Sequence, residues 1–242
     1  MARRRFFVDR VHNHRAELTG DDARHLSRVL RAEPGQRYEI SDNHCAYLAE
    51  IAEITARHVT FAVIEPLPAP LPQPDITLYA ALIKFDRFEW LVEKATELGV
   101  SRLVPVDAER SEKGLAAAAL KRIDRWRKIA HESSQQSRRL TVPEIAPAEP
   151  FAGAIAGDAS PRRFFLDEQP GAPMLLQCLQ AAVDINTVSI LTGPEGGWAD
   201  RERGAALAAG WTPVSLGPQI LRAETAALTA LAVISQACHI PS

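Results

Sequence analysis

The sequence predicts an α/β protein in two parts: a small β-rich part, and then a larger part in which helices cover a parallel sheet. Two observations lead to this prediction. Residues 66–75 are rich in alternating prolines, which fix φ and lack an amide donor, so this stretch should join neither helix nor sheet. At the same place the pattern changes from short runs of β-formers to alternating strands and helices. We therefore expect domains at 1–65 and 76–242, joined by a stiff proline-rich linker.

The N-terminal part contains short runs rich in β-forming residues, at 6–8, 37–41, 46–51 and 58–64. One helix is expected among them, beginning at residues 20–22 and closing near Gly35. Arg24, Arg28 and Arg31 recur at helical spacing, so they should share one face of this helix. A small β-barrel that displays such an arginine stripe could bind RNA, although an ordinary exposed helix explains the same charges.

The C-terminal part alternates predicted strands with predicted helices. Strands are expected at 76–82, 102–106, 163–166, 188–192 and 213–216. Between the first two, Asp86 is expected to cap a helix, with Glu89 three residues on, and Gly99 should end it. Alternation of this kind predicts a parallel sheet with helices packed on it.

Composition and cysteine usage exclude several classes of protein. The 242 residues are 46% hydrophobic and 24% charged, and no apolar stretch is long enough to span a bilayer, so no membrane partner is expected. The N-terminus meets Asp9 before any apolar region develops, which argues against a secretory signal. Three widely separated cysteines fit a reducing cytoplasm, and neither they nor the histidines show metal-ligand spacing. We therefore expect a cytoplasmic protein without a metal.

Charge is unevenly distributed along the chain. The net charge is −2, but residues 110–139 hold nine Lys or Arg and three Asp or Glu, a local charge of +6. A local basic surface of this kind can engage phosphates while the rest of the protein stays close to neutral. A solvated helix face would account for the same count.

Glycines follow two of the predicted strands at their carboxyl ends. One strand runs into Gly193-Pro194-Glu195-Gly196-Gly197-Trp198, after which Asp200 is expected to cap the next helix. A second ends at Leu216-Gly217, and residues 220–226 then enter an apolar helix. Glycines at such ends let a ligand approach the backbone, so we expect a binding site here, although a plain turn is the simpler explanation. The glycine patterns of dinucleotide folds, P-loops and esterases are absent from the sequence.

These motifs together resemble the SPOUT class of methyltransferases and, more narrowly, the RsmE-like family of 16S ribosomal RNA uridine-N3 methyltransferases. The motifs that carry the resemblance are residues 193–197, 216–217 and 221–226, with further similar segments at 25–31, 86–100 and 125–145. The likeness covers nearly the whole chain. It departs at Phe85, where the family commonly has glycine, and at Ser133-Ser134, which replaces a more usual Glu-Ala pair.

The resemblance implies a PUA-like barrel followed by a SPOUT domain with a C-terminal trefoil knot, paired as a homodimer. It implies S-adenosyl-L-methionine as cofactor, in a pocket lined by Thr192, Gly193, Gly196, Gly197, Leu216, Gly217, Ile220, Leu221, Thr225 and Ala226. Ribosomal RNA of the small subunit would be held by Arg24, Arg28, Arg31, Arg138 and Arg139.

The implied reaction is displacement at a sulfonium methyl by uracil N3, which must be both exposed and deprotonated. Arg222 is the best candidate for stabilising charge on the uracil oxygens, because a guanidinium offers paired donors. Glu195 or Glu224 would accept the proton. Two alternatives remain open: a SPOUT methyltransferase with another RNA target, and an RNA-binding module without catalytic activity.

Overall fold

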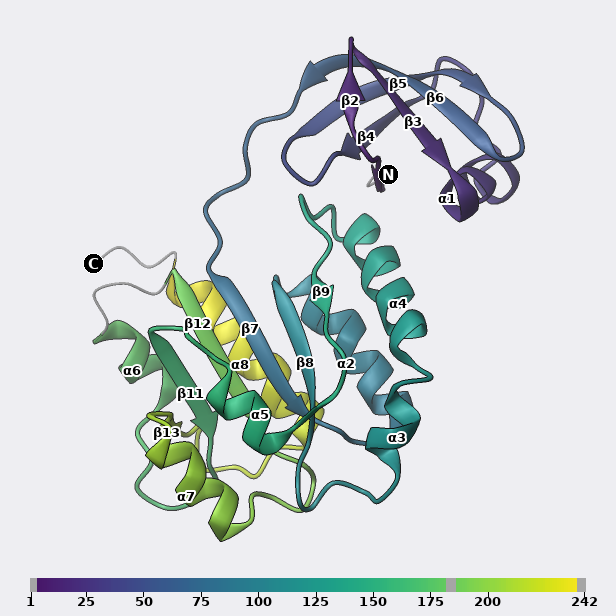
Figure 1. Cartoon of the computed structure of the whole chain (residues 1–242). Coiled ribbons are helices and arrows are strands. Elements are labelled where there is room, and N and C mark those ends of the chain that lie inside the picture. The colour runs from purple at the N-terminus through teal and green to yellow at the C-terminus, as the bar shows by residue number, and fades with distance from the viewer. Residues whose placement is uncertain (1–3, 182–185, 239–242) are drawn as a thin grey trace. The chain divides into compact units, whose positions relative to one another are not determined.

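The computed structural model describes residues 4–181 and 186–238, and the chain divides into two compact units (Figure 1). The first unit comprises the chain up to Leu71 together with His131–Val142, and the second comprises Pro72–Ala130 and the chain from Pro143 onward. Each unit has a sheet of its own. Within the described ranges, no helix has both the length and the apolar character that a bilayer crossing demands.

The first unit is built on a six-stranded sheet in the order β1-β4-β5-β6-β3-β2. Its strands are β1 (Arg5–Phe7), β2 (Val11–His12), β3 (Arg15–Thr19), β4 (Arg37–Ser41), β5 (Ala46–Ile54) and β6 (His58–Pro66). The pairing of β1 with β4 is parallel and the remaining pairings are antiparallel. Phe6, Ile40, Ile51 and Phe61 are fully or almost fully buried and form its core with Leu26. The predicted runs of β-formers became β1, β4, β5 and β6, whereas the sequence reading missed β2 and β3.

The predicted N-terminal helix is shorter than expected and changes its winding. An α-helix α1 (Gly20–Arg24) passes into a π-helix η1 (His25–Val29), in which the amide of Leu30 bonds to the carbonyl of His25 at 3.0 Å. Arg31 then adopts a left-handed conformation with φ +49°, which ends the helix. The prediction of one helix reaching Gly35 is therefore wrong. Arg28 lies in the π-helical turn and Arg31 beyond it, so the α-helical spacing that was expected to place Arg24, Arg28 and Arg31 on one face does not apply.

Residues 131–142, which the sequence reading assigns to the second domain, lie with the first unit. His131 Nε2 is 2.7 Å from Asp22 Oδ2, and Ser41 Oγ donates to the carbonyl of Leu140 at 2.6 Å. Arg138 pairs with Glu39 at 2.8 Å. Burial alone would raise the pKa of Asp22, but the hydrogen bond and charge of His131 bring that pKa below its ordinary value. These polar contacts bind a distant stretch of chain to the small sheet.

The second unit confirms the predicted parallel sheet. Its strands are β7 (Asp75–Ala81), β8 (Arg102–Asp107), β9 (Glu144–Ile145), β10 (Glu149–Pro150), β11 (Arg162–Leu166), β12 (Thr187–Thr192) and β13 (Thr212–Val214). They follow the order β10-β8-β7-β12-β11-β13, with β9 beside β8. Every pairing among them is parallel, so the carboxyl ends of all the strands meet at one edge.

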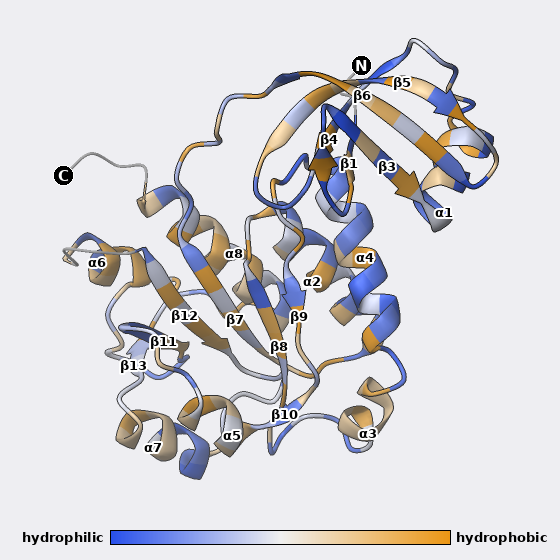
Figure 2. Ribbon diagram, turned by 45° about the horizontal axis from the view of Figure 1, so that its top comes forward, coloured by the Kyte–Doolittle hydropathy of each residue, from blue (hydrophilic) through white to orange (hydrophobic). Residues whose placement is uncertain are grey.

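Helices cover both faces of this sheet. They are α2 (Phe85–Glu97), α3 (Leu115–Ala119), α5 (Phe151–Ala156), α6 (Leu175–Gln180), α7 (Asp200–Ala208) and α8 (Ala223–Ala237), while α4 (Ile123–Gln136) belongs partly to each unit. Strand β7 is buried on both sides: Ile76 and Leu78 face the core shared with α2 and α8, and Tyr79 faces Trp211 on the other side. Figure 2 shows this as strands and α8 coloured largely hydrophobic, in contrast to the hydrophilic α4.

Helix ends show where local sequence rules held and where they failed. Gly99 follows α2 in a left-handed conformation with φ +96°, as predicted for a residue that ends a helix. Both predicted caps are wrong: Lys84 occupies the N-cap of α2, and Ala199 occupies that of α7. At α7 Ala199 has the extended backbone of an N-cap and Asp200 is already the first helical residue, while the carboxylate of Glu202 accepts the hydrogen bond of the Ala199 amide.

Candidate cofactor-binding and active site

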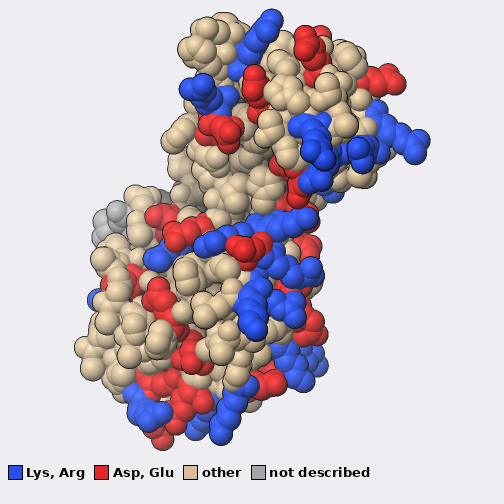
Figure 3. All heavy atoms as spheres, turned by 45° about the vertical axis from the view of Figure 1, so that its right-hand side comes forward, with Lys and Arg blue, Asp and Glu red and all other residues tan. Residues whose placement is uncertain are grey.

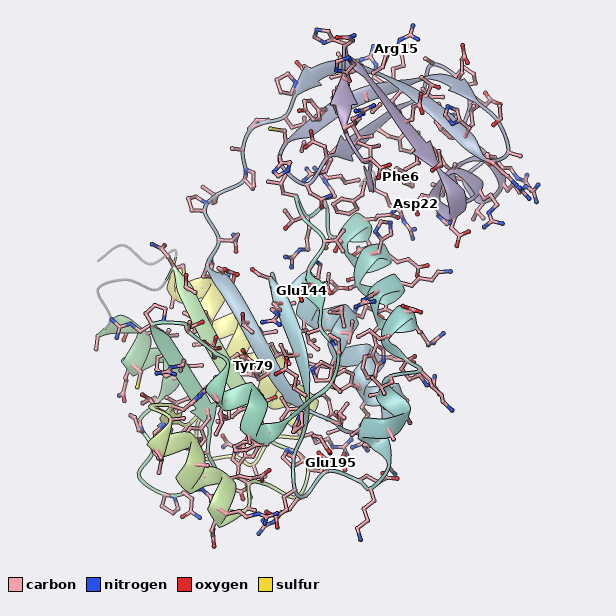
Figure 4. The ribbon with its side chains drawn as sticks, in the orientation of Figure 1. Phe6, Arg15, Asp22, Tyr79, Glu144 and Glu195 are labelled. Carbon is pink, nitrogen blue, oxygen red and sulfur yellow. The ribbon has the colours of Figure 1, made fainter. Side chains whose placement is uncertain are left out.

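A cavity of about 530 Å³ lies in the second unit at the carboxyl edge of the parallel sheet. Its wall comes from segments that follow three neighbouring strands: 166–168 after β11, residues within 193–198 after β12, and 214–223 after β13. Arg87 of α2 and Ala226 of α8 complete it. Parallel strands bring these segments together because they end at the same edge. Figure 4 shows Glu195 beyond the strand ends.

Most of the predicted cofactor residues line this cavity. They are Gly193, Gly197, Leu216, Gly217, Ile220, Leu221 and Ala226. Of the residues that the structure describes, Thr192, Gly196 and Thr225 stand outside the lining. Thr192 is buried at the end of β12, and Gly196 faces Arg110. The structure thus brings together residues from both glycine-ended strands, as the sequence reading expected.

The segment of residues 193–199, called the glycine loop below, has two glycines packed closely against neighbouring side chains. Gly197 has φ +68°, and a Cβ there would lie 2.6 Å from Oε1 of Glu168. A Cβ on Gly193 would lie 3.1 Å from the ring of Trp198. That ring is fixed in turn, because Trp198 Nε1 donates to the carbonyl of Leu166 at 2.8 Å. A side chain at either position would therefore require its neighbour to shift, and at Gly197 it would also have to adopt a left-handed backbone.

Charges of both signs face the cavity. Arg87 and Glu195, which both line it, form an ion pair. Asp167 is buried and pairs with Arg203 at 3.0 Å, and this hydrogen bond raises the pKa of Arg203. Glu168 is exposed on the same wall. Such a lining suits a ligand that carries both positive and negative groups.

Arg222 and Glu224 stand at the start of α8. Arg222 is exposed, lines the cavity and has an extended backbone at φ −65° and ψ 151°. Glu224 is 7% exposed and stays outside the lining, and its Oε2 accepts a hydrogen bond from no described residue. The positive end of the helix dipole favours a carboxylate there. The two predicted proton acceptors thus differ. Glu195 lines the cavity but pairs with Arg87, whereas Glu224 is buried and its Oε2 has no hydrogen-bond partner among the described residues.

The five arginines predicted to bind RNA all belong to the first unit. Arg28 and Arg31 are exposed, and Arg24 is exposed and pairs with Asp21. Arg138 pairs with Glu39, while Arg139 donates from Nε to the carbonyl of Thr141 at 3.1 Å. Burial lowers the pKa of Arg139 to about 10. Arg28 and Arg31 are therefore the most accessible of the five.

Further basic residues lie on the part of α4 that belongs to the second unit. Figure 3 shows Lys and Arg gathered on the side of the molecule that carries this helix. The exposed ones are Arg125, Arg127 and Lys128 on α4, with Lys121 and Arg122 directly before the helix. Three of them are partly neutralised, because Arg122 and Arg125 lie 3.4 and 2.7 Å from Oε1 of Glu89, and Arg127 lies 3.6 Å from Asp124. The basic count of the sequence thus corresponds to a real surface, with less free charge than the count alone indicates.

Among the wall residues to which sequence reasoning assigned no role, Arg87, Asp167, Glu168 and Trp198 carry charged or aromatic side chains. The two carboxylates follow β11 directly, so their place after a strand was a usable signal. Trp198 adjoins the glycines and was part of the motif without being assigned a role. Arg87 comes from α2, and no local pattern relates it to a loop that lies 108 residues further on.

Comparisons with known proteins identify the family. A family model described as an RNA methyltransferase domain matches residues 69–235, and one described as an RNA methyltransferase PUA domain matches 18–64. Ribosomal RNA small subunit methyltransferase E from Synechocystis sp. is 35% identical over 224 residues, which are 90% of this chain and 72% of the relative.

Two solved structures share the fold over almost the full length. One is a ribosomal RNA small subunit methyltransferase E from Neisseria gonorrhoeae bound to S-adenosyl methionine, with a TM-score of 0.86, 27% identity and 97% of both chains covered. The other, from Legionella pneumophila in complex with the same cofactor, has a TM-score of 0.86, 26% identity and 98% of both chains covered. The chain therefore belongs to the RNA methyltransferase family that includes ribosomal RNA small subunit methyltransferase E, with a PUA domain before a SPOUT-type methyltransferase domain.

Proposed function

We propose that the protein transfers a methyl group from S-adenosylmethionine to N3 of a uridine in 16S ribosomal RNA. The observation that carries the proposal is the cavity at the carboxyl edge of the sheet, lined by residues of both glycine-ended strands. Its volume of about 530 Å³ is suited to a ligand of cofactor size. Family membership and the two cofactor-bound relatives support the same conclusion.

The residues of the cavity fit S-adenosylmethionine. Gly193 and Gly197 line the cavity without side chains, so a ligand can approach the backbone closely there. Leu216, Ile220 and Leu221 supply apolar contacts for an adenine ring. The charged lining matches a molecule with ammonium, carboxylate and sulfonium groups. When bound, this cofactor supplies an electrophilic methyl group.

The chain itself must bind the uracil, stabilise its charge and take its N3 proton. Arg222 is exposed on the cavity wall, where its guanidinium can donate paired hydrogen bonds to the uracil oxygens as negative charge develops. Glu195 and Glu224 are the candidate proton acceptors. Glu195 has the right location, and Glu224 has the carboxylate oxygen without a described partner. Holding the two reactants in line supplies a further part of the rate.

Substrate binding and assembly extend the proposal. Arg24, Arg28, Arg31, Arg138 and Arg139 would contact phosphates of the small ribosomal subunit's RNA. A homodimer is supported by Leu228 and Val233 of the apolar helix α8, which stay partly exposed in one chain. We also propose the trefoil knot of the SPOUT class for the C-terminal segment, and a cytoplasmic location, where ribosomal RNA is found and where thiols such as that of Cys45 stay reduced.

Methyl transfer from isotope-labelled S-adenosylmethionine tests the proposal directly. The purified protein is incubated with small ribosomal subunits that lack the modification, and labelled nucleosides are identified by mass spectrometry. We expect labelled 3-methyluridine. A different labelled nucleoside would overturn the uridine-N3 assignment and keep the methyltransferase. No label, together with no cofactor binding by calorimetry, would instead favour an RNA-binding module without catalytic activity.

A further inference from the structure

A buried carboxylate holds the end of the glycine loop. Glu202 lies in the first turn of α7 and is 5% exposed. Its Oε2 accepts a hydrogen bond at 3.1 Å from the amide of Ala199, where the loop enters the helix. Its Oε1 accepts another at 2.8 Å from the amide of Glu109, which follows β8 and lies 93 residues away in the sequence. One side chain thus joins the loop to a distant segment of the same unit.

The residue after Glu109 contacts the same loop a second time. Arg110 donates from Nη1 to the carbonyl of Gly196 at 3.0 Å. The contact is close, because a Cβ on Gly196 would lie 3.2 Å from the Cβ of Arg110. The segment after β8 therefore supports the glycine loop at Ala199, through Glu202, and at Gly196, through Arg110.

We propose that Glu202 and Arg110 are positioning residues for cofactor binding, because they fix the glycine loop that forms one wall of the cavity. The inference rests on the proposed function, since it takes this cavity as the cofactor site. Among the described residues neither of the two lines the cavity, so they act through Gly193, Glu195 and Gly197. Capping of α7 explains the bond to Ala199 alone. The bond to the Glu109 amide does not cap the helix. It connects α7 to the segment after β8 whose Arg110 contacts the glycine loop.

Glu202→Gln tests the bridge with little change of shape. A glutamine side chain has one acceptor oxygen and turns an NH₂ group toward the other amide, so one of the two backbone amides loses its partner. We expect the KM for S-adenosylmethionine to rise about tenfold, while the KM for RNA stays unchanged and kcat falls by less than about twofold. Arg110→Met should act in the same direction, and Arg110→Lys should restore part of the loss because lysine keeps a donor.

Arg201→Met is the matched control. Arg201 adjoins Glu202 on α7, is 78% exposed, and pairs through Nε with Oε2 of Glu109 at 2.5 Å. Within the described parts of the chain, its hydrogen bond and its ion pair both go to Glu109, and neither involves residues 193–199. Its removal takes a charge from the same helix without loosening the loop, so the KM for the cofactor should stay at the wild-type value.

The outcomes separate this inference from the proposed function. If the wild-type protein binds no cofactor in calorimetry, the proposed function fails and the inference fails with it. If the wild type binds and both Glu202→Gln and Arg110→Met keep its KM, only the inference is overturned. A purely structural role would lower the melting temperature and the active fraction, and so reduce kcat at constant KM, which also overturns it. Should Glu202→Gln not fold, Arg110→Met and Gly196→Ala decide the question, and both are expected to raise the KM for the cofactor.

Discussion

Replacement of Gly197 by alanine is expected to weaken cofactor binding through the backbone. Gly197 has φ +68°, a left-handed conformation that costs a residue with a Cβ about 1–2 kcal/mol. The added Cβ would also lie 2.6 Å from Oε1 of Glu168, but Glu168 is exposed and its side chain can move away. The backbone term therefore dominates. If the loop relaxes to avoid it, affinity for S-adenosylmethionine should fall by a factor of roughly 5 to 30.

Isothermal calorimetry of the free protein with S-adenosylmethionine measures this effect, and Gly204→Ala provides the control. Gly204 lies in α7 and is exposed, and a methyl group added there would meet no atom within 4 Å beyond the backbone of its own helix. Alanine there should raise stability by about 0.5–1 kcal/mol through helix propensity and leave the affinity unchanged. Wild-type affinity and wild-type melting temperature in Gly197→Ala would refute the reasoning, because the left-handed backbone would then carry no cost.

Three further predictions follow from other parts of the structure. Arg222→Ala should lower the single-turnover rate constant of methyl transfer about 10²–10³-fold, with the cofactor Kd unchanged. A wild-type rate constant in this variant would exclude Arg222 from the mechanism. The pKa of Asp22 is lowered in the folded state, so its contribution to stability is present above the ordinary value of 3.8 and is lost as pH falls through the folded pKa. Thermal melts from pH 7 to pH 3 should therefore show a smaller acid-induced loss for Asp22→Asn than for the wild type; equal losses would contradict this. Neutralising Arg24, Arg28 and Arg31 should flatten the salt dependence of RNA binding. The slope of log K against log salt should fall by about 1 for each phosphate contact that is lost, and an unchanged slope would exclude these arginines as an RNA-binding surface.

The cavity could be predicted from sequence because its main determinants are local. Glycines after β12 and β13 mark the ends of these strands. In a parallel sheet the carboxyl ends of all strands lie at one edge, so the two glycine segments meet there. Gly193, Gly197 and Gly217 were found in this way. Thr192, Gly196 and Thr225 belong to the same motifs but lie outside the lining: Thr192 is buried at the end of β12, Gly196 faces Arg110, and Thr225 lies in α8.

The remaining contacts could not be predicted because they depend on tertiary pairing. Arg87 reaches Glu195 only when α2 packs beside the glycine loop. The capping rule failed at Asp200 because α7 begins one residue earlier than predicted, with Ala199 at the N-cap and its amide bonded to the carboxylate of Glu202. The π-helical turn at His25–Val29 could not be predicted from helix propensities, which describe α-helical winding, whereas π-helices are rare.

The small N-terminal sheet is not a complete structural unit by itself, so a gene fusion that carried the sheet alone would omit part of the unit. Ser41 and Glu39 have partners 99 residues further along the chain, and Asp22 has one 109 residues further along. The proline linker looks like a natural junction, but a cut there would separate the sheet from its partners in residues 131–142. Exchange between homologues would have to carry residues 131–142 along with the sheet.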